Sequence, residues 1–239
     1  KFYEKKIIWK IAKFALKKNK KVVCVGEPDY KKLRKELKNV VLIKNGVNLE
    51  EFDKVKNIKI EKKITYVGRI NFQKGVDLLV QAFKKLPNKK GFKLNIIGKT
   101  EDLFFDQLFK EDGIVFIGEI NNRERIIKEL KSSYCLVFPS RFGEGLSLVL
   151  LEQMASGRPI ICSNLDSTKI LKNSALFFNP GDEEDLKTKI EYAIKNKIKI
   201  EKIAKKSKKI SEEYNLDNTI NSLSKIYKVR KLKWEINQR

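Results

Sequence analysis

Two glutamates separated by seven residues, Glu144 and Glu152, stand on either side of a glycine-bearing loop and the start of an expected helix. Gly143 and Gly145 flank the first glutamate, so the backbone there can come close to a ligand. The amino terminus of the helix offers unpaired N–H groups and a partial positive charge, which suit a phosphate. A carboxylate on each side could hold hydroxyl groups. The segment therefore predicts a pocket for a phosphorylated, polyhydroxylated ligand.

Two basic residues stand at a second loop that precedes an expected helix. Gly68 and Arg69 directly follow an apolar run, and Lys74 comes just before Gly75. The arginine offers forked donors and the lysine a point charge, so the two could clamp a diphosphate. Lysine and arginine are abundant throughout this chain, and a solvated loop is the alternative interpretation of this segment alone.

The alternation of apolar runs and helical patterns after residue 63 predicts a doubly wound, Rossmann-like α/β fold with a parallel sheet. The expected strands cover residues 64–67, 92–97, 114–117, 134–138, 159–162 and 175–178, and the expected helices cover 76–86, 103–109 and 123–130. Near-continuous apolar strands suit a sheet that is covered on both faces. Ligands of such sheets bind beyond the carboxyl ends of the strands, where Gly68, Gly98, Gly118 and Pro139 stand.

Both ends of the chain differ from this central part. A helix over 2–16, strands over 22–25 and 40–43, and a helix over 30–37 are expected first. The first helix has an apolar stripe beside many lysines. We favour an ordinary helix packed on a sheet, and a membrane-surface helix is the alternative. Residues 48–62 are polar and predict a linker. From Asp182 onwards the pattern is helical.

The net charge of +23 is concentrated at these two ends. Residues 1–44 hold 15 basic and 4 acidic side chains, and residues 186–239 hold 16 and 6. Basic and aromatic residues are not interleaved on a recognisable nucleic-acid module, so nucleic acid is not an expected partner. An anionic membrane surface and a solvated lysine-rich background both remain open.

Several classes of protein are excluded by what the sequence lacks. Histidine is absent, which removes histidine triads and histidine metal sites from this chain. Cys24, Cys135 and Cys162 each stand in an apolar run and are expected to be buried thiols. No apolar run approaches the roughly 18 residues of a membrane span. The sequence begins with Lys1 and shows no signal-peptide pattern, which leaves open that it is a fragment.

Taken together, the motifs resemble a known family over residues 20–230. They are Asn45-Gly46-Val47-Asn48, Gly68-Arg69, Lys74-Gly75, Pro139-Ser140, Glu144 and Glu152 seven residues apart, Gly157-Arg158-Pro159, and Asn179-Pro180-Gly181-Asp182. In this order and spacing they resemble the C-terminal half of a retaining family 4 glycosyltransferase of GT-B fold. Each motif alone is unspecific, and the combination is specific.

The resemblance implies a nucleotide-sugar donor, transfer with retention of anomeric configuration, and no metal or other cofactor. It implies that Arg69 and Lys74 neutralise the leaving diphosphate and that Glu144 contacts hydroxyls of the transferred sugar. It further implies donor binding by Gly68, Gly145, Leu146, Ser147, Leu148 and Glu152, the last at the ribose. Fixed cations around a leaving group would act by electrostatic stabilisation.

The resemblance also implies a domain organisation. Residues 1–47 are expected to be the last helix–strand–helix–strand of an otherwise missing N-terminal domain, and 48–62 a linker. Residues 63–198 are expected to bind the donor, and 199–239 to form helices that return toward the N-terminal segment. The acceptor implied is a glycan or a lipid-linked molecule, as in polysaccharide or glycolipid biosynthesis by a hexosyltransferase.

Two alternatives remain beside this interpretation. One is a GT-B nucleotide-sugar epimerase. The other is a noncatalytic basic module that docks on an anionic membrane or nucleic acid through residues 1–21 and 199–239. A cytoplasmic location is expected in each case, and the basic ends leave peripheral attachment to the cytoplasmic face of the membrane open.

Overall fold

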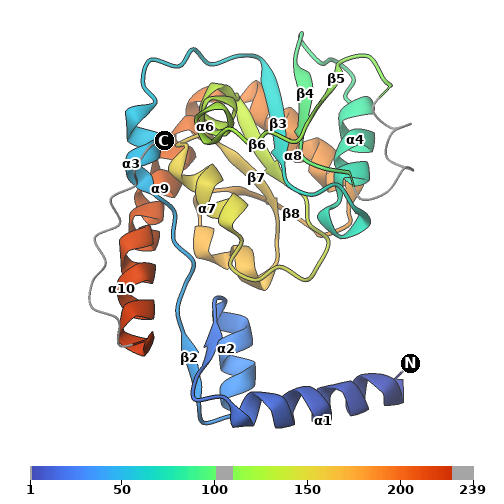
Figure 1. The fold of residues 1–239 in the computed structure, drawn as a ribbon. Helices are drawn as coiled ribbons and strands as arrows, with labels where there is room; N and C mark the ends of the chain where they lie inside the picture. The colour runs from blue at the N-terminus through green and yellow to red at the C-terminus, as the bar shows by residue number, and fades with distance from the viewer. Residues whose placement is uncertain (1, 101–109, 228–239) are drawn as a thin grey trace.

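The computed structural model describes residues 2–100 and 110–227 and contains two parallel sheets of very different size (Figure 1). The smaller sheet comes from the N-terminal segment, whose elements are α1 (Phe2–Lys18), β1 (Val22–Cys24), α2 (Glu27–Arg34) and β2 (Val40–Leu42). The larger sheet has six strands: β3 (Lys63–Val67), β4 (Lys93–Ile97), β5 (Ile114–Gly118), β6 (Cys135–Phe138), β7 (Ile160–Ser163) and β8 (Leu176–Phe178). The expected helix over 103–109 lies outside the described residues.

The strand order of the larger sheet is β5-β4-β3-β6-β7-β8, and all neighbours are parallel. The chain builds outward from β3 to β5 and then returns to place β6 on the free side of β3. Ile64 of β3 lies opposite Cys135 of β6 in this pairing. The connections on the two sides of the β3–β6 pair therefore diverge, and a crevice opens at the carboxyl ends of these strands.

Helices cover both faces of this sheet because successive strand residues point to opposite sides. Cys135 and Val137 belong to one hydrophobic core, and Leu136 and Phe138 belong to the other. On the first face α4 (Val76–Lys84) packs against α8 (Glu183–Lys195). On the second face lie α6 (Arg123–Ser132), α7 (Leu148–Ala155) and α9 (Lys197–Ser211). The central strands β3, β6 and β7 are thus buried on both sides, whereas Val115 and Phe116 of the edge strand β5 are exposed.

The N-terminal segment forms a small unit with its own buried cluster. β1 and β2 pair in parallel, with Val22 opposite Val40. Cys24, Leu37 and Val40 are buried between this sheet and the helices. Ile8, Ile11 and Phe14 of α1 are each more than 60% exposed, at 65%, 65% and 61%. The apolar stripe of the first helix is therefore largely uncovered in this chain.

The polar segment 48–62, for which the sequence predicts a linker, contains a helix that sequence reasoning missed. This helix is α3 (Leu49–Lys54), and its Phe52 side chain is only 1% exposed. Phe52 and Val55 belong to the core on the second face of the large sheet. Two well-placed apolar residues anchor the segment although its composition is polar.

The C-terminal helices end in a segment that lies against the exit from the small sheet. α10 (Leu216–Tyr227) follows a 3-10 turn, η3 (Glu212–Tyr214), and Asn215 forms a parallel bridge with Val47. The Thr219 hydroxyl donates to the Lys44 carbonyl at 2.9 Å. Figure 1 shows α10 running beside the segment that leads away from β2, at the same end of the molecule as α1.

The three cysteines are buried and unpaired, as the sequence predicts. Burial raises the pKa of the Cys135 thiol to about 12 and raises the pKa of Cys162 further. Over the described residues, none of the helices has the length and apolar character that a membrane crossing requires.

Candidate functional site

The crevice beside β3 and β6 brings together the two loops singled out in the sequence. A cavity of about 120 Å³ opens there, and Gly68, Arg69, Lys74 and Ser147 line it together with five other residues. These five are Tyr66, Val67, Phe138, Ser140 and Val149. The strand order is what joins the loops, because Arg69 and Ser147 are far apart in the sequence.

Lys74 and Glu144 meet in a direct ion pair. The Lys74 Nζ lies 2.6 Å from Glu144 Oε1, and the exposed fractions of the two side chains are 16% and 7%. The Ser140 hydroxyl donates to the same carboxylate oxygen at 2.6 Å. Glu144 is therefore held on one oxygen by two donors, next to the cavity that Arg69 lines.

The position of Lys74 is set by the turn η1 (Phe72–Lys74) that precedes α4. The Asn71 side chain accepts from the Lys74 backbone N–H at 3.0 Å. Gly75 has a φ of 68°, and a Cβ there would lie 2.2 Å from the Pro139 carbonyl oxygen. Only glycine permits this approach. The glycine therefore lets the start of α4 sit directly against the end of β6.

The loop that carries Glu144 is tied to the same turn. The Arg141 backbone N–H donates to the Gln73 carbonyl at 2.8 Å. The Gln73 side-chain amide donates to the carbonyls of Phe142 and Gly143 at 3.1 and 3.2 Å. The guanidinium of Arg141 also forms two hydrogen bonds with the Asp77 carboxylate. The two loops are thus one connected structure before any ligand arrives.

Gly68 and Arg69 follow β3 in a tightly packed corner. Gly68 and Gly98 both have a φ of 147°, and a Cβ on Gly98 would lie 1.8 Å from the Gly68 carbonyl oxygen. The Tyr66 hydroxyl donates to the Arg69 carbonyl at 2.5 Å. This corner holds the backbone of Arg69 at the rim of the crevice.

The start of α7 faces the same crevice. Ser147 is the cap residue of the helix, and its side chain makes no capping hydrogen bond to the helix backbone. Leu146 is buried, and its carbonyl accepts from the Asn45 side-chain amide at 2.7 Å. Leu148 is 53% exposed. The amides of this first turn are a suitable place for an anion.

Glu152 is on α7 but does not line this cavity. Its carboxylate accepts a very short hydrogen bond from Arg123 Nη1, and Arg123 Nε also donates to Glu51 at 2.7 Å. Burial by itself lowers the pKa of Arg123. The hydrogen bond with Glu51 and the attraction of Glu152 outweigh burial, so that the pKa lies above its usual value. The structure brings together Gly68, Arg69, Lys74, Glu144 and Ser147, whereas Glu152 forms a separate cluster.

Sequence reasoning missed Arg123 as a partner of Glu152, because no local spacing relates residues on two different helices. It also missed Gln73 as the link between the loops. The Asn45-Gly46 turn is part of the motif set. The hydrogen bond from Asn45 to the Leu146 carbonyl ties this turn to the residues before α7.

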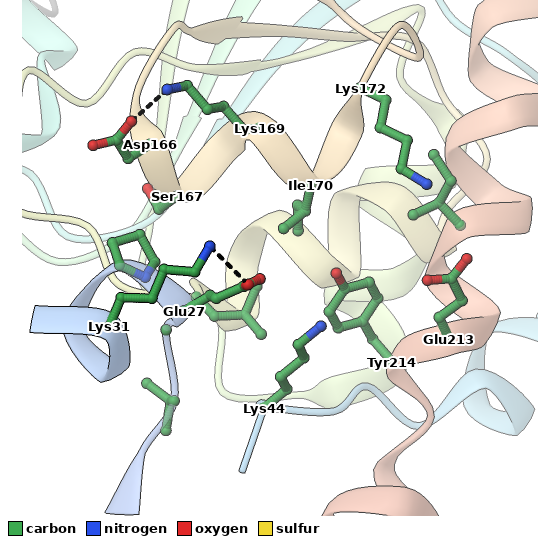
Figure 2. A pocket seen from close by; sticks show the side chains of 15 residues that line it. Glu27, Lys31, Lys44, Asp166, Ser167, Lys169, Ile170, Lys172, Glu213 and Tyr214 are labelled. Atoms are coloured by element: carbon green, nitrogen blue, oxygen red, sulfur yellow. Dashed lines mark hydrogen bonds and ion pairs between the residues drawn. The ribbon is translucent and has the colours of Figure 1, made fainter. Parts of the chain in front are cut away.

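A second and larger cavity, of about 690 Å³, lies where the N-terminal segment meets the large unit (Figure 2). Leu146 lines it, so it adjoins the Glu144 loop. Its other walls come from the β1–α2 loop, from Lys44, from the 3-10 helix η2 (Asp166–Leu171), and from residues near Tyr214. No local pattern in the sequence predicts this cavity, because its walls are scattered along the chain.

The amino-acid sequence of the chain is similar to those of glycosyltransferases. The sequence profile described as glycosyl transferases group 1 matches residues 47–210, which is most of the chain. An uncharacterized glycosyltransferase of Methanocaldococcus jannaschii is 30% identical over 213 residues, which cover 80% of this chain and 54% of that protein. The chain therefore spans about half the length of this relative.

Solved structures share the fold of most of this chain at low sequence identity. HepE from Anabaena, determined in complex with UDP, superposes with a TM-score of 0.76 at 15% identity, covering 92% of this chain and 67% of that one. The C-terminal domain of the group 1 protein LpcC from Francisella tularensis superposes with a TM-score of 0.62 at 22% identity. That match covers 72% of this chain and 100% of the other.

Proposed function

Because the chain belongs to the glycosyl transferases group 1 family, we propose that it supplies the donor-binding half of an enzyme that transfers a sugar from a nucleotide-sugar donor to an acceptor. The predicted fold, a parallel Rossmann-like sheet with helices on both faces, is confirmed and is that of GT-B glycosyltransferases. The observation that carries the proposal is the meeting of Lys74 and Glu144 beside Arg69 at the crevice of the sheet.

The donor diphosphate would occupy the cavity at the start of α7. Arg69 and Lys74 line this cavity, and both carry positive charge. Ser147 leaves the first-turn amides of α7 without a side-chain cap, so these N–H groups and the helix dipole can meet phosphate oxygens. In the unliganded site Lys74 is paired with Glu144, and the diphosphate would take over part of that interaction.

The two carboxylates have separate roles in this proposal. Glu144 keeps a second oxygen beyond the one that accepts from Lys74 and Ser140, and it would bind hydroxyls of the transferred sugar. Glu152, further along α7, would bind the ribose, with Arg123 orienting its carboxylate. A donor that reaches both would lie across the amino-terminal end of α7.

The proposed reaction is transfer with retention of configuration, as in family 4. The acceptor oxygen forms a bond to the anomeric carbon while the bond from that carbon to the diphosphate oxygen breaks. The proton of the acceptor hydroxyl passes to the departing diphosphate. Arg69 and Lys74 stabilise the negative charge that develops on the leaving group, which is electrostatic catalysis by fixed cations. The proposal assigns no metal ion or other cofactor a role.

The transferred group is proposed to be a hexose and the acceptor a glycan or a lipid-linked molecule. HepE was crystallised with UDP, which supports a nucleoside diphosphate as the common part of the donor. UDP and GDP are therefore the first probes to use.

Isothermal titration calorimetry of the chain with UDP and GDP tests the donor site. We expect Arg69→Ala and Lys74→Ala to weaken binding of the better nucleotide about tenfold or more, because each removes a charge-assisted contact. Lys93→Ala is the matched control, since Lys93 is exposed at the opposite, amino-terminal end of β4. Binding that is equal in all three variants would contradict the assigned site, as would the absence of binding by both nucleotides.

A further inference from the structure

The cavity of about 690 Å³ is within the size range of small-molecule sites and is not part of the proposed donor site. Figure 2 shows Lys44 and Lys31 reaching into it from the N-terminal segment, while Lys169 and Lys172 stand on the opposite wall. Tyr214 closes one side. Loops and helices of both the N-terminal segment and the large unit therefore line this one cavity.

This cavity and the smaller donor cavity lie on the two sides of one loop. Leu146 lines the large cavity and Ser147 lines the small one. A Cβ on Gly26, at the edge of the large cavity, would lie 3.5 Å from the Leu146 nitrogen and 3.6 Å from the Gly145 Cα. A molecule held in the large cavity is thus next to the loop that carries Glu144.

One wall of the cavity contains a buried hydroxyl without a partner. Ser167 is 7% exposed, and its Oγ makes no hydrogen bond. The neighbouring Thr168 hydroxyl donates to the Ser163 carbonyl at 2.7 Å, so the same turn satisfies one hydroxyl and leaves the other open. Buried polar groups are normally satisfied. The Ser167 hydroxyl is therefore available for a hydrogen bond to a molecule in the cavity.

The lysines of the cavity fall into two kinds. Lys31 and Lys169 are paired with carboxylates of their own helices, at 3.1 Å from Glu27 and 2.5 Å from Asp166. Lys44 and Lys172 form no ion pair with any described carboxylate, and the Lys44 Nζ lies 5.3 Å above the Tyr214 ring. Neither lysine is thus in direct contact with a carboxylate, although Lys44 is near enough to Glu27 for the two charges to attract.

The backbone at Lys172 is also unusual. Its φ is 51° and its ψ is −114°, a combination that a residue with a side chain rarely adopts. Such conformations cost free energy and concentrate at functional sites. At this point the chain places a lysine that lines the cavity, and Figure 2 shows its side chain on the same side of the view as Glu213.

We propose that this cavity binds the acceptor and that the acceptor carries a phosphate group on a sugar or polyol. The proposal rests on the proposed transferase function and specifies its second substrate. Lys44 and Lys172 supply the charge that a phosphate requires, and Ser167 supplies a hydrogen bond. The carboxylate of Glu213, which also lines the cavity, is suited to accept from the acceptor's hydroxyls.

Calorimetric titration with glucose 6-phosphate tests this site on the whole chain. We expect Lys44→Gln and Lys172→Gln each to weaken its binding about tenfold and Ser167→Ala to weaken it about threefold. Lys205→Gln is the matched control, because it removes the same charge from an exposed position of α9 outside the cavity. Neutral glucose is expected to bind far more weakly. A thermal unfolding midpoint within the wild-type range establishes that each variant is folded.

UDP or GDP titrated into the same variants separates this proposal from the donor site. Nucleotide binding that is unchanged in the Lys44 and Lys172 variants, together with weakened sugar-phosphate binding, supports the acceptor cavity. Glucose 6-phosphate that is displaced by the nucleotide, or that binds all variants equally, overturns it while leaving the donor assignment intact. Conversely, the chain could bind neither nucleotide and yet bind glucose 6-phosphate in a way that depends on Lys172. That result would contradict the transferase proposal, and the cavity would remain an anion-binding site.

Vesicles distinguish a lipid phosphate from a soluble one. Phosphatidylcholine vesicles doped with phosphatidic acid are compared with glucose 6-phosphate. Vesicle binding that falls with Lys172→Gln and not with Lys205→Gln supports a lipid-borne phosphate in the cavity. If Lys172→Gln weakens the binding of glucose 6-phosphate and leaves vesicle binding unchanged, the result supports a soluble acceptor. If Lys172→Gln alters neither, the cavity does not bind phosphate and the proposal is wrong.

Discussion

Lys74 and Glu144 form an ion pair that the proposed donor would rearrange. The pair is largely buried, with the Ser140 hydroxyl on the same carboxylate oxygen. The negative charge of Glu144 opposes a diphosphate in the cavity that Lys74 lines, while its oxygens would favour the hydroxyls of a sugar. One residue therefore acts in opposite directions on the nucleotide part and on the sugar part of the donor.

Replacing Glu144 by glutamine should reveal both effects. We expect Glu144→Gln to tighten the binding of UDP alone by about threefold to tenfold, because a like charge near the phosphates is removed. UDP-glucose should gain nothing or bind more weakly, because the carboxylate no longer accepts from the sugar. Calorimetry with UDP and with UDP-glucose measures the ratio of variant to wild-type affinity for each ligand. An equal change for both would place Glu144 away from the sugar.

Arg123 is a positioning residue for Glu152 in the proposed site. It contacts Glu51 on one side and Glu152 on the other, and its guanidinium lies 5.6 Å from the centre of the Phe52 ring. It thereby links helix α3 to the carboxylate that is expected to bind the ribose. If the role of Arg123 were purely structural, its replacement would weaken the binding of every nucleotide to the same extent.

We expect Arg123→Gln to weaken UDP binding about fivefold, because the Glu152 carboxylate loses the partner that orients it. The loss should disappear with a 2′,3′-dideoxynucleoside diphosphate, which lacks the hydroxyls that Glu152 would hold. Glu152→Ala should show the same dependence on the hydroxyls. Equal losses for both nucleotides would show that Arg123 acts through the fold alone.

The elements that carry the site are positioned by the pairing of β3 with β6. This pairing places the turn η1 beside the loop after β6, and Gly75 permits their close contact. Each strand and most helices follow from local patterns of apolar residues. The order of the strands in the sheet does not follow from such patterns, because parallel strands are joined by long crossovers that allow several orders. The parallel sheet predicted from periodicity places both loops at the carboxyl ends of its strands, but it does not determine that β3 and β6 are neighbours.

Helix α3 shows where composition fails as a guide to structure. Residues 48–62 are mostly polar, yet Phe52 and Val55 are buried in the core of the large unit. A single buried aromatic residue can anchor a short helix whose remaining side chains face water. The average polarity of residues 48–62 therefore predicts a linker, whereas the structure has a helix there that packs on the large unit.

Removing the aromatic ring of Phe52 should destabilise the large unit. We expect Phe52→Ala to lower the free energy of unfolding by about 3–4 kcal/mol, through lost burial and the cavity that remains. Ile198→Ala, at a position that is 72% exposed, serves as the control and should change it by less than about 0.5 kcal/mol. Urea denaturation followed by circular dichroism measures both. Equal midpoints would mean that α3 does not contribute to the core.

The molecule as a whole carries a strong positive charge, and its N-terminal helix has an uncovered apolar face. The net charge is +23, and Ile8, Ile11 and Phe14 are exposed on α1. Two explanations stay open: attachment to an anionic membrane surface, and packing against further protein elements. Charge alone would give binding that salt abolishes, whereas an inserted helix would also need its apolar residues.

Vesicle flotation at two salt concentrations tests the membrane explanation. We expect the chain to float with phosphatidylglycerol vesicles and not with phosphatidylcholine vesicles, and to be released substantially as salt rises. Phe14→Asp should weaken flotation several-fold more than Ile198→Asp, which places the same charge on the exposed side of α9. If the two variants float equally, α1 does not insert and its apolar face is suited to a protein partner instead.

By itself the sequence determined the α/β class, the positions of most strands and helices, and the residue types suited to a phosphorylated, polyhydroxylated ligand. These properties follow from local periodicity and from the chemistry of side chains near glycines. Only the tertiary structure decided that Lys74 contacts Glu144, that Arg123 holds Glu152, and that a lysine-lined cavity adjoins the Glu144 loop. Each of these joins residues that are far apart in the chain. Such contacts depend on strand order and packing, which no local pattern encodes.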